Sequence, residues 1–242
     1  MENGERIDEI IYPILKDVWG YSDFRPMQRE IIHQIMLNRD LLAILPTGGG
    51  KSICFQVPAL AKRGICIVVS PLIALIKDQV QNLKKLNIKA LSVHSGMSYR
   101  EVDIALDNAI YGNYKFLYLS PERLNTQLFR ARVSRMDVSM IVVDEAHCIS
   151  QWGYDFRPDY LTISQIKSEV ARNRRDVDSE FIPHDVPIIA LTATATEKVA
   201  DDICDRLSFA SKNIIRSGFD RPNLSYLVKQ TENKLGNLLA LC

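Results

Sequence analysis

A glycine-rich turn that ends in lysine and serine is the first feature of the sequence that could do chemistry. The run 46–52 reads Pro-Thr-Gly-Gly-Gly-Lys-Ser and follows the apolar segment Leu41–Leu45. Glycines allow a backbone to wrap around phosphate oxygens, and the N-terminus of a following helix adds a positive dipole. Lys51 would reach the β- and γ-phosphates of a nucleotide, and the hydroxyl of Ser52 would ligate Mg²⁺. The expected nucleotide-binding residues of the turn are Thr47, Gly48, Gly49, Gly50, Lys51 and Ser52.

One position departs from the usual phosphate-binding pattern, because Leu45 stands where that pattern has its first glycine. A purely structural glycine-rich turn between a strand and a helix is the alternative interpretation. Such a turn would not require the Gly-Lys-Ser sequence that occurs here, so the sequence favours a phosphate site.

Two adjacent carboxylates follow a second apolar segment, Met140–Val143. The carboxyl ends of parallel strands meet at one edge of a sheet, so we expect Asp144 and Glu145 beside the glycine-rich turn. There Asp144 would hold Mg²⁺, and Glu145 would orient and polarise the attacking water. An acidic pair alone is weak evidence, since acidic residues often begin a loop or a helix. Together with the Gly-Lys-Ser run, the pair predicts binding and hydrolysis of a nucleoside triphosphate.

Short apolar runs alternate with longer amphipathic stretches along the chain. The expected strands are Leu41–Leu45, Ile65–Val69, Ala90–Val93, Phe116–Leu119, Met140–Val143 and Ile188–Leu191. The expected helices are Ile53–Ala61, Leu72–Leu86, Tyr99–Ile110 and Glu197–Leu207. Strands that are apolar at nearly every position are typical of sheets buried on both faces. The pattern therefore predicts an α/β fold with a mostly parallel sheet and helices on both faces.

Composition places the chain among ordinary globular proteins. It has 242 residues, a formal net charge of +1, 47% hydrophobic and 24% charged residues, which excludes disordered and fibrous classes. The near-zero charge argues against bulk electrostatic binding of nucleic acid but leaves a local phosphate-binding groove open. Five cysteines without Cys-x-x-Cys spacing predict idle thiols in a reducing compartment. With neither a signal peptide nor a long apolar run, we expect a cytoplasmic protein without a membrane partner, nucleoid-associated if bacterial.

Several longer motifs resemble those of a known family. Asp-Glu-Ala-His at 144–147, together with the glycine-rich turn, resembles superfamily 2 helicases. The run 147–158, which reads His-Cys-Ile-Ser-Gln-Trp-Gly-Tyr-Asp-Phe-Arg-Pro, resembles the aromatic-rich loop of RecQ DNA helicases. Further matches lie at 19–32, 70–79, 120–124 and 191–195. The resemblance covers nearly the whole chain and implies the first RecA-like, P-loop NTPase lobe of an ATP-dependent DNA helicase.

The resemblance also implies cofactors and roles. ATP and Mg²⁺ would be bound, with Arg25 and Gln28 at the adenine. The amide of Gln28 can pair with the N6 and N7 edge of that base. The alternative is that both residues belong to an ordinary surface helix. The implied catalytic residues are Lys51, Asp144, Glu145 and His147. His147 resembles a coupling residue and not a metal ligand, since no cysteine or histidine partner has ligand spacing, and no zinc is expected here. Thr192 and Thr194 resemble the motif that couples hydrolysis to strand movement.

Single-stranded and partly duplex DNA is the implied partner. The residues expected at nucleic acid are Ser70, Pro71, Lys77, Trp152, Phe156 and Arg157. Aromatic side chains stack on unpaired bases, and arginine adds a cation–π or phosphate contact. On pattern alone, a hydrophobic loop more often belongs to the core, and an ordinary Ser-Pro helix start explains 70–72 equally well. The family often has histidine where this chain has Tyr154, a substitution that keeps a stacking role.

Domain boundaries are implied by the same resemblance. Residues 1–228 would form the first lobe, with 1–38 as an adenine-reading helical segment, and 229–242 would begin a linker toward a second RecA-like lobe. The arginine finger expected from a second lobe has no counterpart here. We therefore expect this chain alone to bind nucleotide poorly to moderately, to hydrolyse it slowly and to unwind nothing. The charged stretch 167–187 is expected to be a solvated helix end and loop, with a DNA-contacting arm as the alternative.

Three other functions fit parts of the sequence. An RNA-remodelling ATPase of the DEAD/DEAH type shares the nucleotide site, but the run 152–158 argues against it. A non-catalytic nucleic-acid-binding adaptor would tolerate loss of Lys51 or Glu145, and both are present. A small-molecule kinase would leave the aromatic loop unexplained. The resemblance therefore favours the motor lobe of a RecQ-type helicase, which moves 3′ to 5′ on DNA in recombination and repair.

Overall fold

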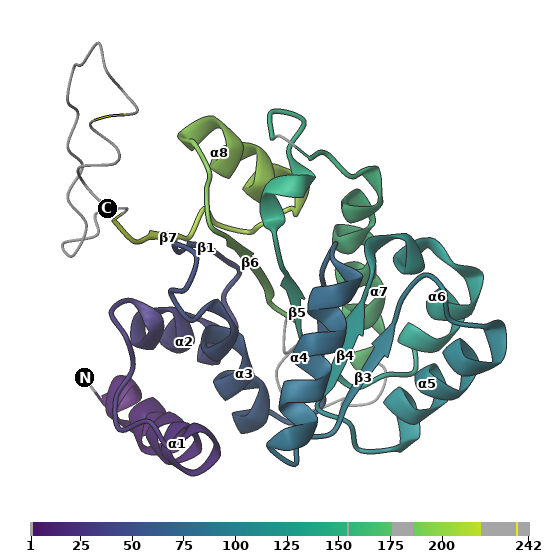
Figure 1. The fold of residues 1–242 in the computed structure, drawn as a ribbon, viewed down its shortest axis with the longest axis horizontal. Coiled ribbons are helices and arrows are strands. Elements are labelled where there is room, and N and C mark those ends of the chain that lie inside the picture. Colours follow the sequence, from purple (N-terminus) through teal and green to yellow (C-terminus); the bar gives the residue numbers. More distant parts are fainter. Residues whose placement is uncertain (1, 154, 176–185, 219–235, 237–242) are drawn as a thin grey trace.

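The computed structural model describes residues 2–153, 155–175, 186–218 and 236. They form a seven-stranded parallel sheet between two layers of helices (Figure 1). The strands are β1 (Leu41–Ile44), β2 (Ile65–Val69), β3 (Ala90–Val93), β4 (Phe116–Leu119), β5 (Val138–Val143), β6 (Ile188–Thr192) and β7 (Ile214–Arg216). Their order across the sheet is β3-β4-β2-β5-β6-β1-β7, and all paired strands are parallel. The predicted α/β fold is confirmed.

Eight α-helices occur in the described part of the chain. They are α1 (Glu2–Trp19), α2 (Gln28–Met36), α3 (Lys51–Ala61), α4 (Ile73–Lys85), α5 (Tyr99–Tyr111), α6 (Gln127–Val133), α7 (Ile163–Arg175) and α8 (Glu197–Arg206). Short 3₁₀ helices span Pro121–Asn125, Ala146–Ile149 and Pro158–Thr162.

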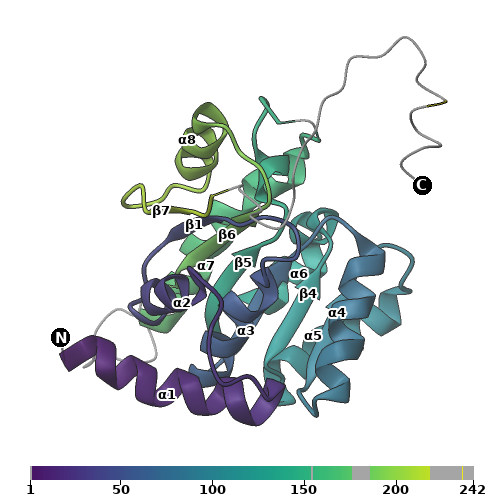
Figure 2. The ribbon, with the colours of Figure 1, turned by 60° about the vertical axis from the view of Figure 1, so that its left-hand side comes forward.

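Both faces of the sheet are buried because alternate residues of a strand enter opposite layers. In β1, Leu41 and Ala43 belong to the core shared with α2, α3 and α4. Leu42 and Ile44 belong to the core shared with α5, α6, α7 and α8. Helix α1 lies outside this arrangement, on the outer side of α2 and α3 (Figure 2). The continuous apolar runs of the sequence are thus explained by burial on two sides.

The register of the central strands brings four strand ends to one carboxyl edge. Strand β5 lies between β2 and β6, with Val143 opposite Val69 and beside Ala190. Strand β6 also pairs with β1, where Thr192 lies opposite Ile44. The segments that leave these four strands therefore begin side by side. They carry the glycine-rich turn and the acidic pair expected at this edge.

All six expected strands and all four expected helices are present; β2, β3 and β4 have the expected ends, and the other three strands and the four helices differ at one or both ends. The helix expected from Ile53 begins at Lys51, because the left-handed Gly50 is its N-terminal boundary. Strand β7 was not expected: it has only three residues at the sheet edge, of which Ile215 alone is buried. Helices α6 and α7 were not expected as elements either. The expectations for Tyr154, for 176–185 of the charged stretch, and for the linker at 229–242 apart from Gly236 lie outside the described residues.

No described helix combines the length and apolar character that a membrane span requires. The described cysteines are buried free thiols: Cys54, Cys66, Cys148 and Cys204. Burial raises the pKa of the Cys54 thiol to about 12 and that of Cys204 to about 11. These two thiols are therefore protonated at neutral pH, as the expectation of idle cysteines requires.

Candidate nucleotide and nucleic-acid site

The glycine-rich turn joins β1 to α3 in a conformation that needs its glycines. Gly48 and Gly50 have φ of 80° and 74°, a left-handed region that residues with a Cβ rarely adopt. A Cβ on Gly49 would lie 2.9 Å from the carbonyl oxygen of Pro46. No side chain caps the start of α3, where Lys51 is the first residue. The N–H groups of its first turn therefore face no competing side chain and suit an anion.

Arg25 and Gln28 contact the glycine-rich turn itself. Nη1 of Arg25 donates to the carbonyl of Gly48 at 2.6 Å. Nε2 of Gln28 donates to the carbonyls of Gly49 and Gly50 at 3.3 and 3.0 Å. The Gln28 side chain is buried, and its Oε1 accepts the backbone N–H of Arg25 at 2.9 Å. These bonds hold the turn against α2. An adenine recognised by Gln28 would therefore use the same side-chain amide that now bonds to the turn.

Asp144 and Glu145 lie at the end of β5, close enough to Lys51 for its charge to act on both. Oδ2 of Asp144 accepts the hydroxyl of Ser70 at 3.3 Å. Burial and the Glu145 charge raise the pKa of Asp144, and Lys51 opposes this rise. The pKa of Glu145 is lowered, first by its hydrogen bond with His147 and further by Lys51. The two halves of the site expected from the sequence are therefore brought together.

The oxygen donors at this place fit Mg²⁺, which prefers one or two carboxylates together with phosphate and water oxygens. Asp144 supplies a carboxylate at the sheet edge, and Ser52 supplies a hydroxyl on the first turn of α3. The pKa of Asp144 is raised by desolvation of its charge. A cation at that carboxylate would offset this desolvation, so the donor set and its electrostatics agree.

His147 connects the carboxylates to β6. Its Nδ1 lies 3.2 Å from Oε2 of Glu145 and 3.1 Å from Oγ1 of Thr192. The Thr192 hydroxyl donates in turn to the carbonyl of Thr194 at 3.2 Å. The Cys148 thiol at Nε2 and the Glu145 carboxylate at Nδ1 raise the pKa of His147 to about 10. A protonated imidazole therefore joins the two motifs. Thr192 contacts it through its hydroxyl, whereas Thr194 offers its carbonyl to Thr192.

Ser70 lies in a different environment from the one expected. Its side chain is 2% exposed, and its hydroxyl donates to Asp144. Its backbone N–H donates to the carbonyl of Leu119 at 3.0 Å, because Ser70 continues β2 in the middle of the sheet. Both donors are used within the fold, so the structure does not support a DNA contact through Ser70. Lys77, by contrast, is exposed on α4, as a DNA contact requires.

The run 147–158 leaves β5 as a loop with exposed aromatic surface. Trp152 is 62% exposed, and Phe156 is half-buried. Arg157 donates to Oδ2 of Asp155 at 3.0 Å and to the carbonyl of Pro71 at 3.4 Å. The exposure of Trp152 argues against a core role for that side chain. The bond from Arg157 joins the aromatic loop to the segment that precedes α4.

Tyr160 and Cys148 belong to this site, although the sequence did not single them out. Tyr160 is buried, and its hydroxyl donates to the backbone carbonyl of Asp144 at 3.2 Å. Burial raises the pKa of that phenol well above its ordinary value. Cys148 lies against His147 with its thiol. Both contacts depend on the path of the loop, which the sequence does not give. The one signal for Tyr160 in the sequence is that it follows the aromatic residues of the run 152–156.

The sequence from Arg25 to Ile203 matches the DEAD/DEAH box helicase family. The chain belongs to this family. The matched segment contains the glycine-rich turn, the acidic pair and the contact between His147 and Thr192. These residues therefore lie within the part of the chain that matches the DEAD/DEAH box helicase family.

Curated relatives of this DEAD/DEAH box domain include RecQ helicases. The ATP-dependent DNA helicase RecQ of Bacillus subtilis (strain 168) is 44% identical over 223 residues, which are 91% of this chain and 36% of that protein. A putative ATP-dependent RNA helicase of Acanthamoeba polyphaga mimivirus is 42% identical over 224 residues, 91% of this chain and 38% of that protein. The resemblance to RecQ helicases is confirmed. The chain spans about a third of the length of the RecQ relatives.

Solved structures share the fold. The Hef helicase domain of Pyrococcus furiosus superposes with a TM-score of 0.61 at 22% sequence identity, covering 86% of this chain and 40% of that chain. The seven-stranded sheet with its two helical layers is thus the RecA-like arrangement of helicase domains, as expected from the motifs.

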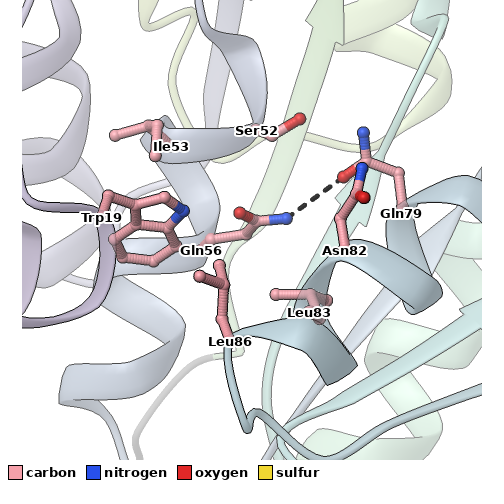
Figure 3. A pocket seen from close by; sticks show the side chains of 8 residues that line it. All are labelled: Trp19, Ser52, Ile53, Gln56, Gln79, Asn82, Leu83 and Leu86. Carbon is pink, nitrogen blue, oxygen red and sulfur yellow. Dashed lines mark hydrogen bonds between the residues drawn. The ribbon is translucent and has the colours of Figure 1, made fainter.

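A cavity of about 190 Å³ separates α3 from α4 in this DEAD/DEAH box domain (Figure 3). It is lined by Trp19, Ser52, Ile53, Gln56, Gln79, Asn82, Leu83 and Leu86. Gln56, which is buried on α3, donates from Nε2 to Oε1 of Gln79 on α4 at 3.2 Å and to the hydroxyl of Tyr118 at 3.4 Å. The helix that begins at the glycine-rich turn is therefore hydrogen-bonded to the helix that carries Lys77.

Proposed function

We propose that this chain is the first motor lobe of a RecQ-type, ATP-dependent DNA helicase. One observation carries the proposal: the phosphate turn, the acidic pair and the exposed aromatic loop lie along one edge of the sheet. The full-length protein would couple ATP hydrolysis to 3′-to-5′ movement on DNA and to unwinding in recombination and repair. Residues 1–228 would form the lobe, and 229–242 would lead to a second RecA-like lobe. Such a protein would act in the cytoplasm, at the nucleoid in a bacterium.

ATP is the proposed nucleotide. The turn 47–52 would surround its phosphates, with Lys51 at the β- and γ-phosphates, because the uncapped start of α3 suits an anion. Arg25 and Gln28 would contact the adenine. Both side chains donate to carbonyls of the turn in this structure, so adenine binding would redistribute these bonds. Recognition of the base and the shape of the phosphate turn would therefore depend on each other.

Hydrolysis would rest on the residues at the end of β5. Mg²⁺, held by Asp144 and Ser52, would neutralise charge on the phosphate oxygens when it is bound. Glu145 would orient and polarise the attacking water, and its lowered pKa keeps the carboxylate ionised for that role. The protonated His147 would hold Glu145 in place through its Nδ1. The same nitrogen contacts the Thr192 hydroxyl, so a shift of Glu145 would also move the contact with Thr192.

A second lobe of the full-length protein would complete the site. Charge develops on the transferring phosphoryl group, and an arginine from a facing lobe stabilises it in related motors. The chain spans about a third of its RecQ relatives, which leaves ample length for such a lobe in those proteins.

DNA is the proposed nucleic acid, in single-stranded and partly duplex form. Trp152 and Phe156 would stack on unpaired bases, while Arg157, Pro71 and Lys77 would lie along the backbone. Support comes from the exposure of Trp152 and from the bond between Arg157 and Pro71, which places the two segments together. His147 begins the same loop and contacts Glu145, so a movement of the loop on DNA binding would change the position of the Glu145 carboxylate.

RNA remodelling is the second candidate, because the mimivirus relative of similar identity is named an RNA helicase. Strand separation by the full-length protein decides between the two. The substrates are partial duplexes of identical sequence: DNA with a 3′ tail, DNA with a 5′ tail, and RNA with a 3′ tail. We expect ATP-dependent separation of the 3′-tailed DNA alone. Separation of the RNA duplex in preference to DNA would establish the second candidate and contradict the first.

A further inference from the structure

One face of α8 lies against the aromatic loop. Lys198, Asp202 and Arg206 recur at four-residue spacing and therefore share one side of this helix. Nζ of Lys198 lies 3.2 Å from the centroid of the Trp152 ring. The guanidinium of Arg206 lies 5.9 Å from the ring of Phe156. Figures 1 and 2 both show α8 beside the segment that follows β5.

Asp202 lies between these two cations on α8. Its Oδ1 accepts Nε of Arg206 at 2.8 Å. Burial raises the pKa of the Asp202 carboxyl, but the Ser150 hydroxyl, Arg206 and the Gln151 N–H outweigh burial and bring it below the ordinary value. The carboxylate is therefore ionised and faces the loop just before Trp152. All three side chains of this face thus act on the loop.

The contact between Lys198 and Trp152 uses the surface that DNA would need. A nucleobase stacks on the flat face of an aromatic ring, and a cation over that ring occupies the same place. Trp152 is otherwise exposed, so Lys198 is the group that a base would have to displace.

We propose that Lys198 is a positioning residue for the aromatic loop. In the absence of DNA the Lys198 side chain covers the Trp152 ring, and it leaves the ring when a base stacks there. The proposal rests on the proposed function in one respect, the identity of the incoming base. It assigns to α8 a part in setting how much DNA is needed to switch on hydrolysis. Displacement of Lys198 would lower the apparent affinity for DNA by the factor with which the covered state is favoured.

The first test is ATP hydrolysis by the full-length protein at increasing concentrations of a single-stranded oligodeoxynucleotide. Lys198→Met keeps the length of the side chain and removes its charge. A cation–π contact at an exposed site shifts an equilibrium by about two- to fivefold, so the half-saturating DNA concentration should fall by that factor. The maximal rate should be unchanged. A rise in the half-saturating concentration would show that Lys198 instead binds phosphate, and it would overturn the proposal, as would no change.

Three control variants separate this effect from a general loss of charge. Lys198→Arg keeps the cation over the ring and should behave as the wild type. Lys212→Met removes the same charge from a lysine that pairs with Asp201 and Asp205, and it should leave the half-saturating DNA concentration unchanged. In a Trp152→Ala background, Lys198→Met should have no further effect. A full effect of Lys198→Met without the indole would overturn the proposal.

A second test needs no DNA and uses the 242-residue chain. Trp19→Phe leaves Trp152 as the sole tryptophan, because the chain has two. Adding Lys198→Ala should increase the quenching of Trp152 fluorescence by acrylamide, since the truncated side chain no longer covers one face of the ring. Adding Lys198→Arg should leave the quenching as it was. Unchanged quenching in the Ala variant would overturn the covering contact, whatever DNA does. If instead quenching increases but DNA fails to stimulate the wild type, the contact stands and the proposed function fails.

Discussion

Glu145 is the residue on which we propose that turnover depends, and its backbone carries strain. Its φ is 49°, in the left-handed region, which costs a residue other than glycine on the order of 1 kcal/mol. The turn ends β5 and lets the carboxylate meet Nδ1 of His147 at 3.2 Å. The strain is maintained by the surrounding contacts, among them the bond from Tyr160 to the Asp144 carbonyl.

Replacing Glu145 by glutamine tests its role at the scale of one functional group. The amide keeps the shape of the side chain but no longer carries the charge that polarises water. We expect Glu145→Gln in the full-length protein to retain ATP binding and to lose about 10²- to 10⁴-fold in turnover. Steady-state hydrolysis and equilibrium binding of ATP measure the two effects separately. Normal turnover would remove Glu145 from the reaction.

The raised pKa of His147, about 10, makes stability depend on pH. The folded state binds the proton more tightly than an ordinary histidine of pKa about 6.5. This contribution is therefore fully present below pH 6.5 and is lost as pH rises toward 10. We expect the wild-type melting temperature to fall relative to that of His147→Gln across this window. A constant difference between the two chains from pH 6.5 to 10 would contradict the assigned proton.

At the scale of elements, the site depends on how helices are fixed to one another. Gln28 at the start of α2 holds the phosphate turn, and Gln56 on α3 bonds to Gln79 on α4. Both contacts use amides that are buried or nearly so. Since buried amides are costly when unpaired, these bonds fix the helices in one arrangement.

A double-mutant cycle measures the link between α3 and α4. Gln56→Leu alone leaves Gln79 and the Tyr118 hydroxyl without this partner and should cost about 1 kcal/mol of unfolding free energy. Gln56→Leu combined with Gln79→Leu should cost less than the sum of the two single changes. Asn82→Leu, in the same cavity, is the control and should add independently of Gln56→Leu. Additivity of the first pair, measured by urea unfolding, would show that the amides do not interact.

The elements of this lobe differ in how well the sequence predicts them. Central strands such as Ile65–Val69 were predicted with correct ends, because burial on both faces leaves an unbroken apolar run. Strand β7 escaped prediction, since an edge strand of three residues leaves no such run. Helix α6 has only seven residues, too few for a clear helical period.

The site was predicted where chemistry and spacing coincide and missed where contacts depend on the fold. The residue types and their spacing predicted the glycine-rich turn and the acidic pair. The resemblance placed Ser70 at DNA, but Ser70 continues β2, is buried and uses its hydroxyl and N–H within the fold. The hydrogen bonds from Arg25 and Gln28 to the turn, and the cation–π contact between Lys198 and Trp152, join residues distant in sequence. Periodicity carries no information about such pairs.

At the scale of the whole molecule, we propose that this chain supplies half of a nucleotide site. The chain spans about a third of its RecQ relatives. In GTPases that share the phosphate-binding turn, an arginine that faces the phosphates contributes about 10³- to 10⁵-fold to turnover. We expect the 242-residue chain alone to hydrolyse ATP at least about 10³-fold more slowly than the full-length protein with DNA. Equal turnover, with or without DNA, would mean that these residues complete the site by themselves.

The most direct test of the central claim is ATP hydrolysis by the full-length protein, measured as single-stranded DNA is added. We expect a rate that rises with DNA and saturates, and that vanishes in Lys51→Ala because the phosphates lose their cation. A rate that does not respond to DNA would contradict the proposed function, since the aromatic loop and Glu145 would then act independently.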